Sequence, residues 1–352
     1  ASRAAFPRRG IFRIHKHGSR KALYTGVAPE GHLPQIDWMA KRKLNLYLFY
    51  VDYYRMDLWE RHKQPLLEAL LDRGFDIEVT MHSIQYFCPP DENLDYGDFG
   101  DGTYRHRHPE WYLPTGAYGH SYQVRVELPA VRDIIAERFL QYLKRNPEVE
   151  TAALWPGDVA VNRPCANLSH TDGYMHFWND LAGQLPRDGI RRHISIPAYM
   201  ELREPPRRVS PAERLHCWYC PIDANYNYPM RHERNLAQRD RLAQWAKSMA
   251  PGHTITFEYY GWQSPLTPMM EKMQSDLRDY RDLGLGGAYG WSGFSNNLMG
   301  ADYRWSLELY TDAHLLWNPD ADTDTLRDIW AGSVFGDAAG AVRITSELLS
   351  RA

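Results

Sequence analysis

Apolar positions recur along the chain in two patterns, as short apolar runs and as longer stretches with helical spacing. Short runs are typical of buried strands, whereas apolar residues three or four apart indicate amphipathic helices. The runs expected to be strands are "GIFRIHKHG", "LNLYLFYVD", "FDIEVTMHS", "ETAALWPGD", "HISIPAYME", "LHCWYCPID", "TITFEYYGW" and "LGGAYGWSG". Helical patterns such as "LPAVRDIIAERFLQYLKRN" and "LAQRDRLAQWAKSM" separate them, several with Gly or Pro near an end.

This regular exchange of strand and helix predicts an α/β fold, namely a (β/α)8 or TIM barrel. We expect the catalytic barrel over residues 1–310 and C-terminal helices packed on it over residues 311–352. A loop rich in Asp, Gly, His and Tyr is inserted near residues 89–122, after the third strand. In a barrel this loop would lie on the catalytic face, either as a lid or as a plain surface excursion.

Charge and hydropathy then narrow the class of partner. The 352 residues carry a formal net charge of −3, with acidic and basic residues interspersed, so we expect no nucleic-acid partner and no polybasic membrane contact. No apolar run approaches the roughly 18 residues of a membrane span, and the first residues lack the apolar stretch of a signal peptide. The oligomeric state is left open.

The cysteines say little about function, whereas the aromatic residues suggest a binding surface. Four cysteines (Cys88, Cys165, Cys217 and Cys220) are too few for a disulfide scaffold and leave the cellular compartment open. A secreted or periplasmic location is slightly favoured over the cytoplasm. Cys217 and Cys220 have CxxC spacing on a strand, where residues three apart face opposite sides, so we expect core residues. The 12 Trp and 23 Tyr, many just after strands, suit a concave binding surface.

Barrel enzymes place their active sites at the carboxyl ends of the strands. Asp158 ends the fourth predicted strand and Glu258 the seventh, which lie on opposite sides of a barrel mouth. Two opposed carboxylates suit glycoside cleavage, with Asp158 as general acid/base and Glu258 as nucleophile. Each has an alternative role: Glu258 could accept a buried Tyr or Arg hydrogen bond, and Asp158 in "PGD" could cap the next helix.

Further polar and aromatic residues near strand ends are candidates for substrate binding. In an inverting enzyme Asp223 becomes a competing base. His15 and His17, two apart, have no nearby acidic partner in sequence to complete a metal site, so we expect neither a metal nor another cofactor. The candidates are Arg13, His15, His82, Trp155, Trp218, Asp223, Tyr260 and Trp262.

Several of these stretches together resemble the family 20 hexosaminidases and their relatives, which include the family 67 α-glucuronidases and a bacterial group of unassigned glycosidase-like domains. "PRRGIF" resembles the Arg-Gly opening of the first strand, which implies that Arg9 grips sugar hydroxyls. "IDWMAKRKLNLYLFYVD" resembles the approach to strand two, and "WPGDV" the Gly-Asp-Glu of strand four. "LGGAYGWSG" places Trp291 at a platform position, and the tail "YTDAHLLWNPDADTDTLRDIWAGSVFGDAA" resembles the post-barrel helices of the unassigned group.

The departures from that pattern also carry information. Asp158 is followed by Val159 where family 20 has its general-acid Glu, "YLFYVDYY" replaces a His-rich segment, and no Glu follows the Trp platform in "WSGFSNN". Relatives usually carry an N-terminal α/β domain, so we expect a catalytic domain alone. The predicted function is a glycosidase releasing a terminal sugar from a carbohydrate substrate, with an acidic sugar as one option because of the Arg and His residues. The alternatives are a carbohydrate-binding barrel without catalysis and a sugar-acid lyase or isomerase.

Overall fold

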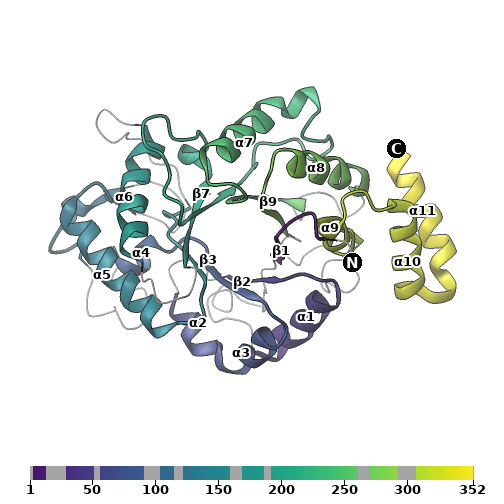
Figure 1. Cartoon of the computed structure of the whole chain (residues 1–352), viewed down its shortest axis with the longest axis horizontal. Helices are drawn as coiled ribbons and strands as arrows, with labels where there is room; N and C mark the ends of the chain where they lie inside the picture. Colours follow the sequence, from purple (N-terminus) through teal and green to yellow (C-terminus); the bar gives the residue numbers. More distant parts are fainter. Residues whose placement is uncertain are drawn as a thin grey trace.

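Eight parallel strands form a ring at the centre of the molecule (Figure 1). The computed structural model describes residues 3–12, 29–50, 56–90, 104–114, 122–158, 169–185, 192–260, 269–291 and 307–351. The strands are β1 (Arg8–Phe12), β2 (Leu46–Tyr50), β3 (Asp76–Thr80), β6 (Thr151–Ala153), β7 (His193–Ala198), β8 (Leu215–Tyr219), β9 (Thr254–Glu258) and β10 (Gly287–Trp291). The Asn45 amide donates to the Arg9 carbonyl at 3.0 Å, which brings β2 beside β1 and nearly closes the ring. The predicted (β/α)8 barrel is therefore confirmed.

Helices cover the outside of this ring (Figure 1). They are α1 (Pro29–Lys41), α2 (Asp57–His62), α3 (Gln64–Leu71), α4 (Ile84–Phe87), α5 (Pro129–Arg145), α6 (His170–Gln184), α7 (Leu236–Ser248), α8 (Met270–Asp282) and α9 (Leu307–Trp317). Helix α9 crosses the expected boundary at residue 310 because it packs against β1 and β10 and completes the ring. Helices α10 (Thr323–Phe335) and α11 (Ala339–Arg351) lie outside it as the appendix.

The insertion after the third strand contains some regular structure of its own. A short 3-10 turn, η3 (Pro109–Trp111), leads into β4 (Tyr112–Pro114), which pairs antiparallel with β5 (Tyr122–Val124). The remaining short turns are η4 (Met200–Leu202), η5 (Glu233–Asn235) and η8 (Gly336–Ala338). The β4–β5 hairpin and η4 both border the cleft described below.

The interior of the barrel is filled by large rings. Trp218 lies at the centre, with its ring centroid 5.3 Å from that of Trp155, 5.7 Å from Phe257 and 4.6 Å from Tyr289. Trp291 extends the group through Phe257, at 6.0 Å. These five side chains, called the aromatic plug below, are almost completely buried. As in other barrels, side chains and not solvent occupy the lumen.

Charged and polar side chains form a second interior layer, nearer the amino-terminal ends of the strands. The Arg8 guanidinium lies 3.2 Å from a Glu78 carboxylate oxygen and donates to Thr151 Oγ1 at 3.3 Å. Burial raises the pKa of Glu78 to about 7, and the attraction of Arg8 limits that rise. The sequence analysis placed no ion pair here, because "PRRGIF" alone does not say which arginine faces inward.

Two glycines at the start of β10, Gly286 just before it and Gly287 as its first residue, are required for steric reasons. A Cβ atom on Gly286 would lie 1.8 Å from the Gly252 carbonyl oxygen, and one on Gly287 would lie 2.0 Å from the Arg8 carbonyl oxygen. Only glycine permits the backbones to approach this closely. "LGLGG" therefore serves strand packing.

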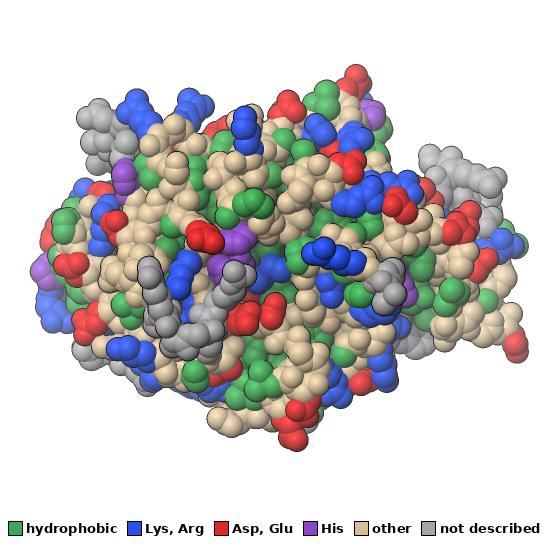
Figure 2. Space-filling view, viewed as in Figure 1, with side chains coloured by type: hydrophobic (Ala, Val, Ile, Leu, Met, Phe, Trp, Pro, Cys, Tyr) green, Lys and Arg blue, Asp and Glu red, His purple; other side chains and the backbone are tan. Residues whose placement is uncertain are grey.

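The outer surface agrees with the charge pattern of the sequence. Figure 2 shows basic and acidic side chains interspersed over the visible face, without one large patch of either sign. Within the described ranges, every helix is too short or too polar to span a bilayer.

Candidate functional site

A cleft opens at the carboxyl ends of β3, β6 and β7, where barrel chemistry is expected. The β4–β5 hairpin forms one side and the turn after β7 forms another. The cleft is lined by His82, Leu113, Gln123, Val124, Glu127, Pro156, Gly157, His170, Tyr174, Pro197, Tyr199, Met200, Glu201 and Leu202. Concave surfaces that mix apolar walls with a few fixed polar groups are typical of small-molecule sites.

Asp158 stands at the edge of this cleft, after β6. Its side chain is 35% exposed, and Oδ1 lies 3.8 Å from His82 Nε2. The Tyr199 hydroxyl donates to the same oxygen at 3.1 Å. The structure thus brings together two predicted residues, Asp158 and His82, and adds Tyr199.

The protonation of His82 follows from its contacts. Nδ1 lies 2.6 Å from the Pro156 carbonyl oxygen, which can only accept, so Nδ1 carries the hydrogen and Nε2 presents its lone pair toward Asp158. Burial lowers the pKa of His82, partly opposed by the charge of Asp158. The two side chains therefore interact through charge, at a distance longer than a hydrogen bond.

The turn that carries Asp158 is held by a buried amide. Gln123 Nε2 donates to the Gly157 carbonyl at 2.7 Å, and the Gly157 amide donates to Gln123 Oε1 at 2.9 Å. Gln85 donates to the same Oε1 at 3.3 Å. Gln123 thus fixes the backbone next to Asp158. Nothing in the sequence around "WPGDV" indicates that a residue so far away in the chain would make this contact.

A second carboxylate, Glu201, lines the cleft on η4. The preceding Met200 has φ of 50°, a left-handed conformation that a non-glycine residue rarely adopts and that is common near functional sites. Burial raises the pKa of the Tyr199 hydroxyl, and the charges of Asp158 and Glu201 raise it further. Tyr199 therefore lies within the field of both carboxylates.

Asp223 sits in the neighbouring loop after β8. Its side chain is exposed, and Oδ2 accepts from Arg203 Nη1 at 2.6 Å, while Arg203 Nε donates to the Met200 carbonyl at 2.8 Å. This ion pair ties the β8 loop to the strained turn. Asp223 does not line the cleft within the described residues.

Glu258 is not where the sequence analysis expected it. Tyr280 of α8 donates to Oε1 at 2.7 Å and Tyr226 donates to Oε2 at 3.1 Å, and only 1% of the residue is exposed. Its neighbours Phe257 and Tyr259 contact the ring of Trp291 in the barrel interior. Since successive strand residues face opposite sides, Glu258 points out of the barrel wall toward α8. This corrects the assignment of Glu258 as nucleophile and matches the alternative of a buried Tyr partner.

Tyr260 belongs to the same outward cluster. It is buried, and burial together with the charges of Glu258 and Asp312 raises the pKa of its hydroxyl. Asp312 of α9 is completely buried, and its own pKa is raised by burial and by Glu258. The expectation that Tyr260 contacts substrate is therefore corrected: it packs between the barrel wall and the helices.

The predicted tryptophan platforms are part of the interior. Trp155, Trp218 and Trp291 are 1%, 0% and 3% exposed, and each packs against other rings of the aromatic plug. A stacking platform must expose one ring face to the sugar, so these side chains form the floor below the mouth. This corrects their assignment as platforms.

Arg9 also has a structural role. Its guanidinium donates to the carbonyls of Lys43 at 2.9 Å and Phe6 at 2.6 Å, and it lies 5.3 Å from the ring centroid of Trp317. Arg8, the neighbour with the opposite orientation, points inward. The predicted sugar grip at Arg9 is therefore corrected. Arg13, His15, His17 and Trp262 lie outside the described residues.

The cleft contains functional candidates that the sequence analysis did not select. Tyr199 lies four residues before Arg203 in "AYMELREPP", and its inward direction follows from Pro197 at the preceding inward position. Gln123 lies far away in the insertion. Alternation along the fifth strand was a usable signal for Tyr199, whereas Gln123 had none.

Comparison with known proteins agrees with this fold. The family model described as "Domain of unknown function (DUF4838)" matches residues 92–346, more than half of the chain. No curated protein is significantly similar in sequence.

Similar solved structures are glycoside hydrolases. A GH138 enzyme targeting pectin rhamnogalacturonan II has a TM-score of 0.60 at 10% identity, over 99% of this chain and 44% of that one. A GH89 enzyme from Clostridium perfringens gives 0.58 at 11% identity, over 97% and 41%. A β-hexosaminidase from Streptomyces plicatus gives 0.55 at 12% identity, over 96% and 69%. The chain thus spans less than half the length of the first and second of these proteins, and at such identities the likeness shows the fold.

Proposed function

The chain belongs to the DUF4838 family, whose description names no function, and from the geometry of the cleft we propose that it is a glycoside hydrolase. The observation that carries the proposal is the placement of Asp158. It is a partly exposed carboxylate at the carboxyl end of a barrel strand, beside the lone pair of His82 and the hydroxyl of Tyr199. The fold it shares with several glycoside hydrolases supports the same reaction class.

Asp158 is the proposed general acid/base. It protonates the leaving glycosidic oxygen as the bond to the anomeric carbon breaks, and the hydrogen bond from Tyr199 holds its carboxyl group in place. Glu201 is the proposed second carboxylate in place of Glu258. It either attacks the anomeric carbon, giving retention, or takes a proton from an attacking water, giving inversion.

The cleft favours a neutral terminal sugar. Its described lining includes Glu127 and Glu201 and no Lys or Arg, so His82 and His170 are the only described lining residues that can offset the negative charge of a uronic acid. The expectation of an acidic sugar rested on Arg9, which lies elsewhere, and on Arg13 and His15, which are not described. We therefore place neutral hexosides ahead of uronides in the substrate panel.

Turnover of a panel of neutral and acidic aryl glycosides tests this proposal. We expect release of the aryl alcohol from at least one neutral glycoside. Asp158→Asn and Glu201→Gln should each lower kcat by about 10²–10⁴, the usual contribution of acid–base catalysis. Glu204→Gln is the matched control, because Glu204 pairs with Arg241 at 2.6 Å away from the cleft lining and should turn over normally.

Other outcomes have definite meanings. Full turnover in both Asp158→Asn and Glu201→Gln would refute the residue assignments. Sugar binding by calorimetry without turnover of any glycoside would favour the carbohydrate-binding alternative, and an unsaturated product would favour the lyase. The anomer released first, followed by NMR, decides between retention and inversion.

A further inference from the structure

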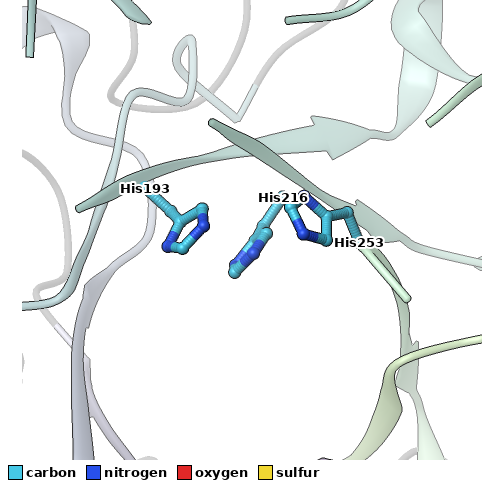
Figure 3. Close-up of side chains that lie close together, drawn as sticks. All are labelled: His193, His216 and His253. Carbon is cyan, nitrogen blue, oxygen red and sulfur yellow. The ribbon is translucent and has the colours of Figure 1, made fainter. Parts of the chain in front are cut away.

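Three histidines lie together on the inner wall of the barrel (Figure 3). They lie at the amino-terminal ends of their strands, whereas the residues proposed for catalysis lie at the carboxyl ends. His193 is the first residue of β7, His216 is the second residue of β8, and His253 immediately precedes β9. One nitrogen from each ring lies within 4.8 Å of one from each of the others. From this convergence we propose that His193, His216 and His253 bind a divalent transition-metal ion, with Zn²⁺ as the expected ion.

The strand register fixes the three positions relative to one another. The Cys217 amide donates to the His253 carbonyl at 2.8 Å, and Cys217 pairs with Thr254, so His216 and His253 are direct neighbours across β8 and β9. Ser195 pairs with His216, which places His193 one inward step further toward the amino-terminal end of β7. The hydrogen-bonded sheet, and not a loop, therefore positions all three ligands, as a precise metal site requires.

The chemistry of the rings suits a metal. His253 Nδ1 lies 3.2 Å from the Leu215 carbonyl oxygen, so it carries the hydrogen and leaves the Nε2 lone pair available. Neutral imidazole is the metal-binding form, and three imidazoles with one open position form a familiar zinc site.

The present ring positions need a small adjustment. The rings of His193 and His216 stack, with centroids 3.9 Å apart and planes 16° apart, while His253 is nearly perpendicular to both. With Zn–N distances of about 2.0–2.1 Å, tetrahedral ligands lie roughly 3.3 Å apart. The nitrogens must therefore approach by at most about 1.5 Å, from the 4.8 Å limit, which rotation of a side chain accomplishes.

The surroundings make the site accessible and set its role. His193 and His253 are partly exposed, so the cluster can be reached from solvent. The Arg8 guanidinium opposes a second positive charge nearby, but it is paired with Glu78 at 3.2 Å. A metal here would link the beginnings of three strands and stabilise the barrel, because binding to the folded state alone adds to its stability.

Metal titration of the purified chain after removal of bound metal tests the site. We expect titration calorimetry to show one Zn²⁺ bound per chain with a micromolar or lower Kd. Thermal unfolding should show a higher Tm with Zn²⁺, and the Co²⁺ form should show the visible absorption of a four-coordinate site. His216→Asn and His253→Asn should each weaken binding at least about tenfold. His232→Asn is the control, since this ring stacks on Tyr228 at 4.2 Å in a surface loop and should leave binding unchanged.

Circular dichroism shows whether each variant is folded, and only folded variants are compared. Asn can replace some hydrogen bonds of an imidazole, and two separate variants are used in case one of them does not fold. Absence of high-affinity Zn²⁺ and Co²⁺ binding in the wild type would overturn the proposal. Binding of undiminished strength in folded His216→Asn and His253→Asn proteins would also overturn it, by placing the metal elsewhere. Neither result depends on glycoside turnover, so the catalytic proposal stands or fails separately.

Discussion

Replacing Glu258 by Gln should lower the free energy of unfolding and leave kcat nearly unchanged, whereas replacing Asp158 by Asn should lower kcat and leave stability nearly unchanged. Glu258 accepts two buried hydroxyl hydrogen bonds, at 2.7 Å from Tyr280 and 3.1 Å from Tyr226. In Glu258→Gln the amide oxygen can keep one of them. The amide nitrogen then faces the hydroxyl of Tyr226, which already accepts from the Tyr259 amide at 2.9 Å, so the Tyr226 hydroxyl proton loses its acceptor.

The magnitude follows from these bonds. A hydrogen bond to a charged group contributes about 1.5–3 kcal/mol, and a buried donor left unsatisfied costs about 1–3 kcal/mol. The loss is partly offset because removing the Glu258 charge relieves its repulsion of Asp312 and Asp276, whose pKa values it raises. We expect Glu258→Gln to lower the free energy of unfolding by about 1–3 kcal/mol and to change kcat less than about threefold.

Asp158→Asn should behave in the opposite way. The side chain is 35% exposed, and Asn can still accept from Tyr199, so the stability change should stay within about 0.5–1 kcal/mol. Loss of the acid/base should lower kcat about 10²–10⁴-fold, or roughly 2.7–5.4 kcal/mol in activation free energy. Urea unfolding followed by tryptophan fluorescence and steady-state kinetics on the best glycoside give both quantities.

One result would refute this reasoning. If Glu258→Gln abolished turnover while unfolding at the same urea concentration as the wild type, Glu258 would have to reach the substrate from the inner face of β9. Tyr280→Phe is a useful companion, because it removes the 2.7 Å bond without altering the carboxylate. It should destabilise the chain by an amount similar to Glu258→Gln and leave kcat unchanged.

Three further changes test other parts of the structure. Gly286→Ala places a Cβ 1.8 Å from a backbone oxygen of Gly252 and should destabilise the chain by about 3 kcal/mol or more in thermal unfolding. The control Gly183→Ala has open space at its position in α6 and should stabilise the chain by up to about 1 kcal/mol. Equal Tm values for the two variants would contradict the close approach at Gly286. Because burial lowers the folded-state pKa of His82, the unfolded chain takes up a proton on this residue at a higher pH than the folded chain does. The stability linked to His82 is therefore present above about pH 6.5 and is lost as the pH falls. In urea unfolding at several pH values, the free energy of unfolding should fall less steeply with decreasing pH for His82→Asn than for the wild type, and parallel curves would argue against a buried neutral ring. Gln123→Leu removes both bonds to Gly157 and should reduce kcat/KM about tenfold while Zn²⁺ binding is unaltered, so unchanged kinetics would show that Asp158 needs no such support.

The barrel could be predicted from sequence because its strands are apolar runs separated by helical patterns. The inward direction of side chains was harder to predict. In a parallel barrel both faces of a strand are buried, so polarity does not mark the lumen. In "TITFEYYGW" the apolar Ile255 and Phe257 line one face, yet Thr256 and Glu258 are equally buried on the other.

The candidate site depended still more on the folded chain. Asp158 was predicted from its place at a strand end, which requires only the order of elements. Gln123 reaches Gly157 across 34 residues of sequence, and the backbone of Met200 is strained, and neither property has a local pattern. By contrast, "HISIP", "LHCWY" and "HTITF" each carry a histidine at the start of a strand. Once the barrel was predicted, that repetition on three consecutive strands could have indicated the histidine cluster.

The aromatic plug has a consequence for how this molecule can be altered. Trp155, Trp218, Phe257, Tyr289 and Trp291 fill the middle of the lumen with buried rings. Among the described residues, these rings lie between the cleft at one opening of the barrel and the histidine cluster at the other. Mutagenesis can therefore alter the cleft beside Asp158 and the histidine cluster independently of each other.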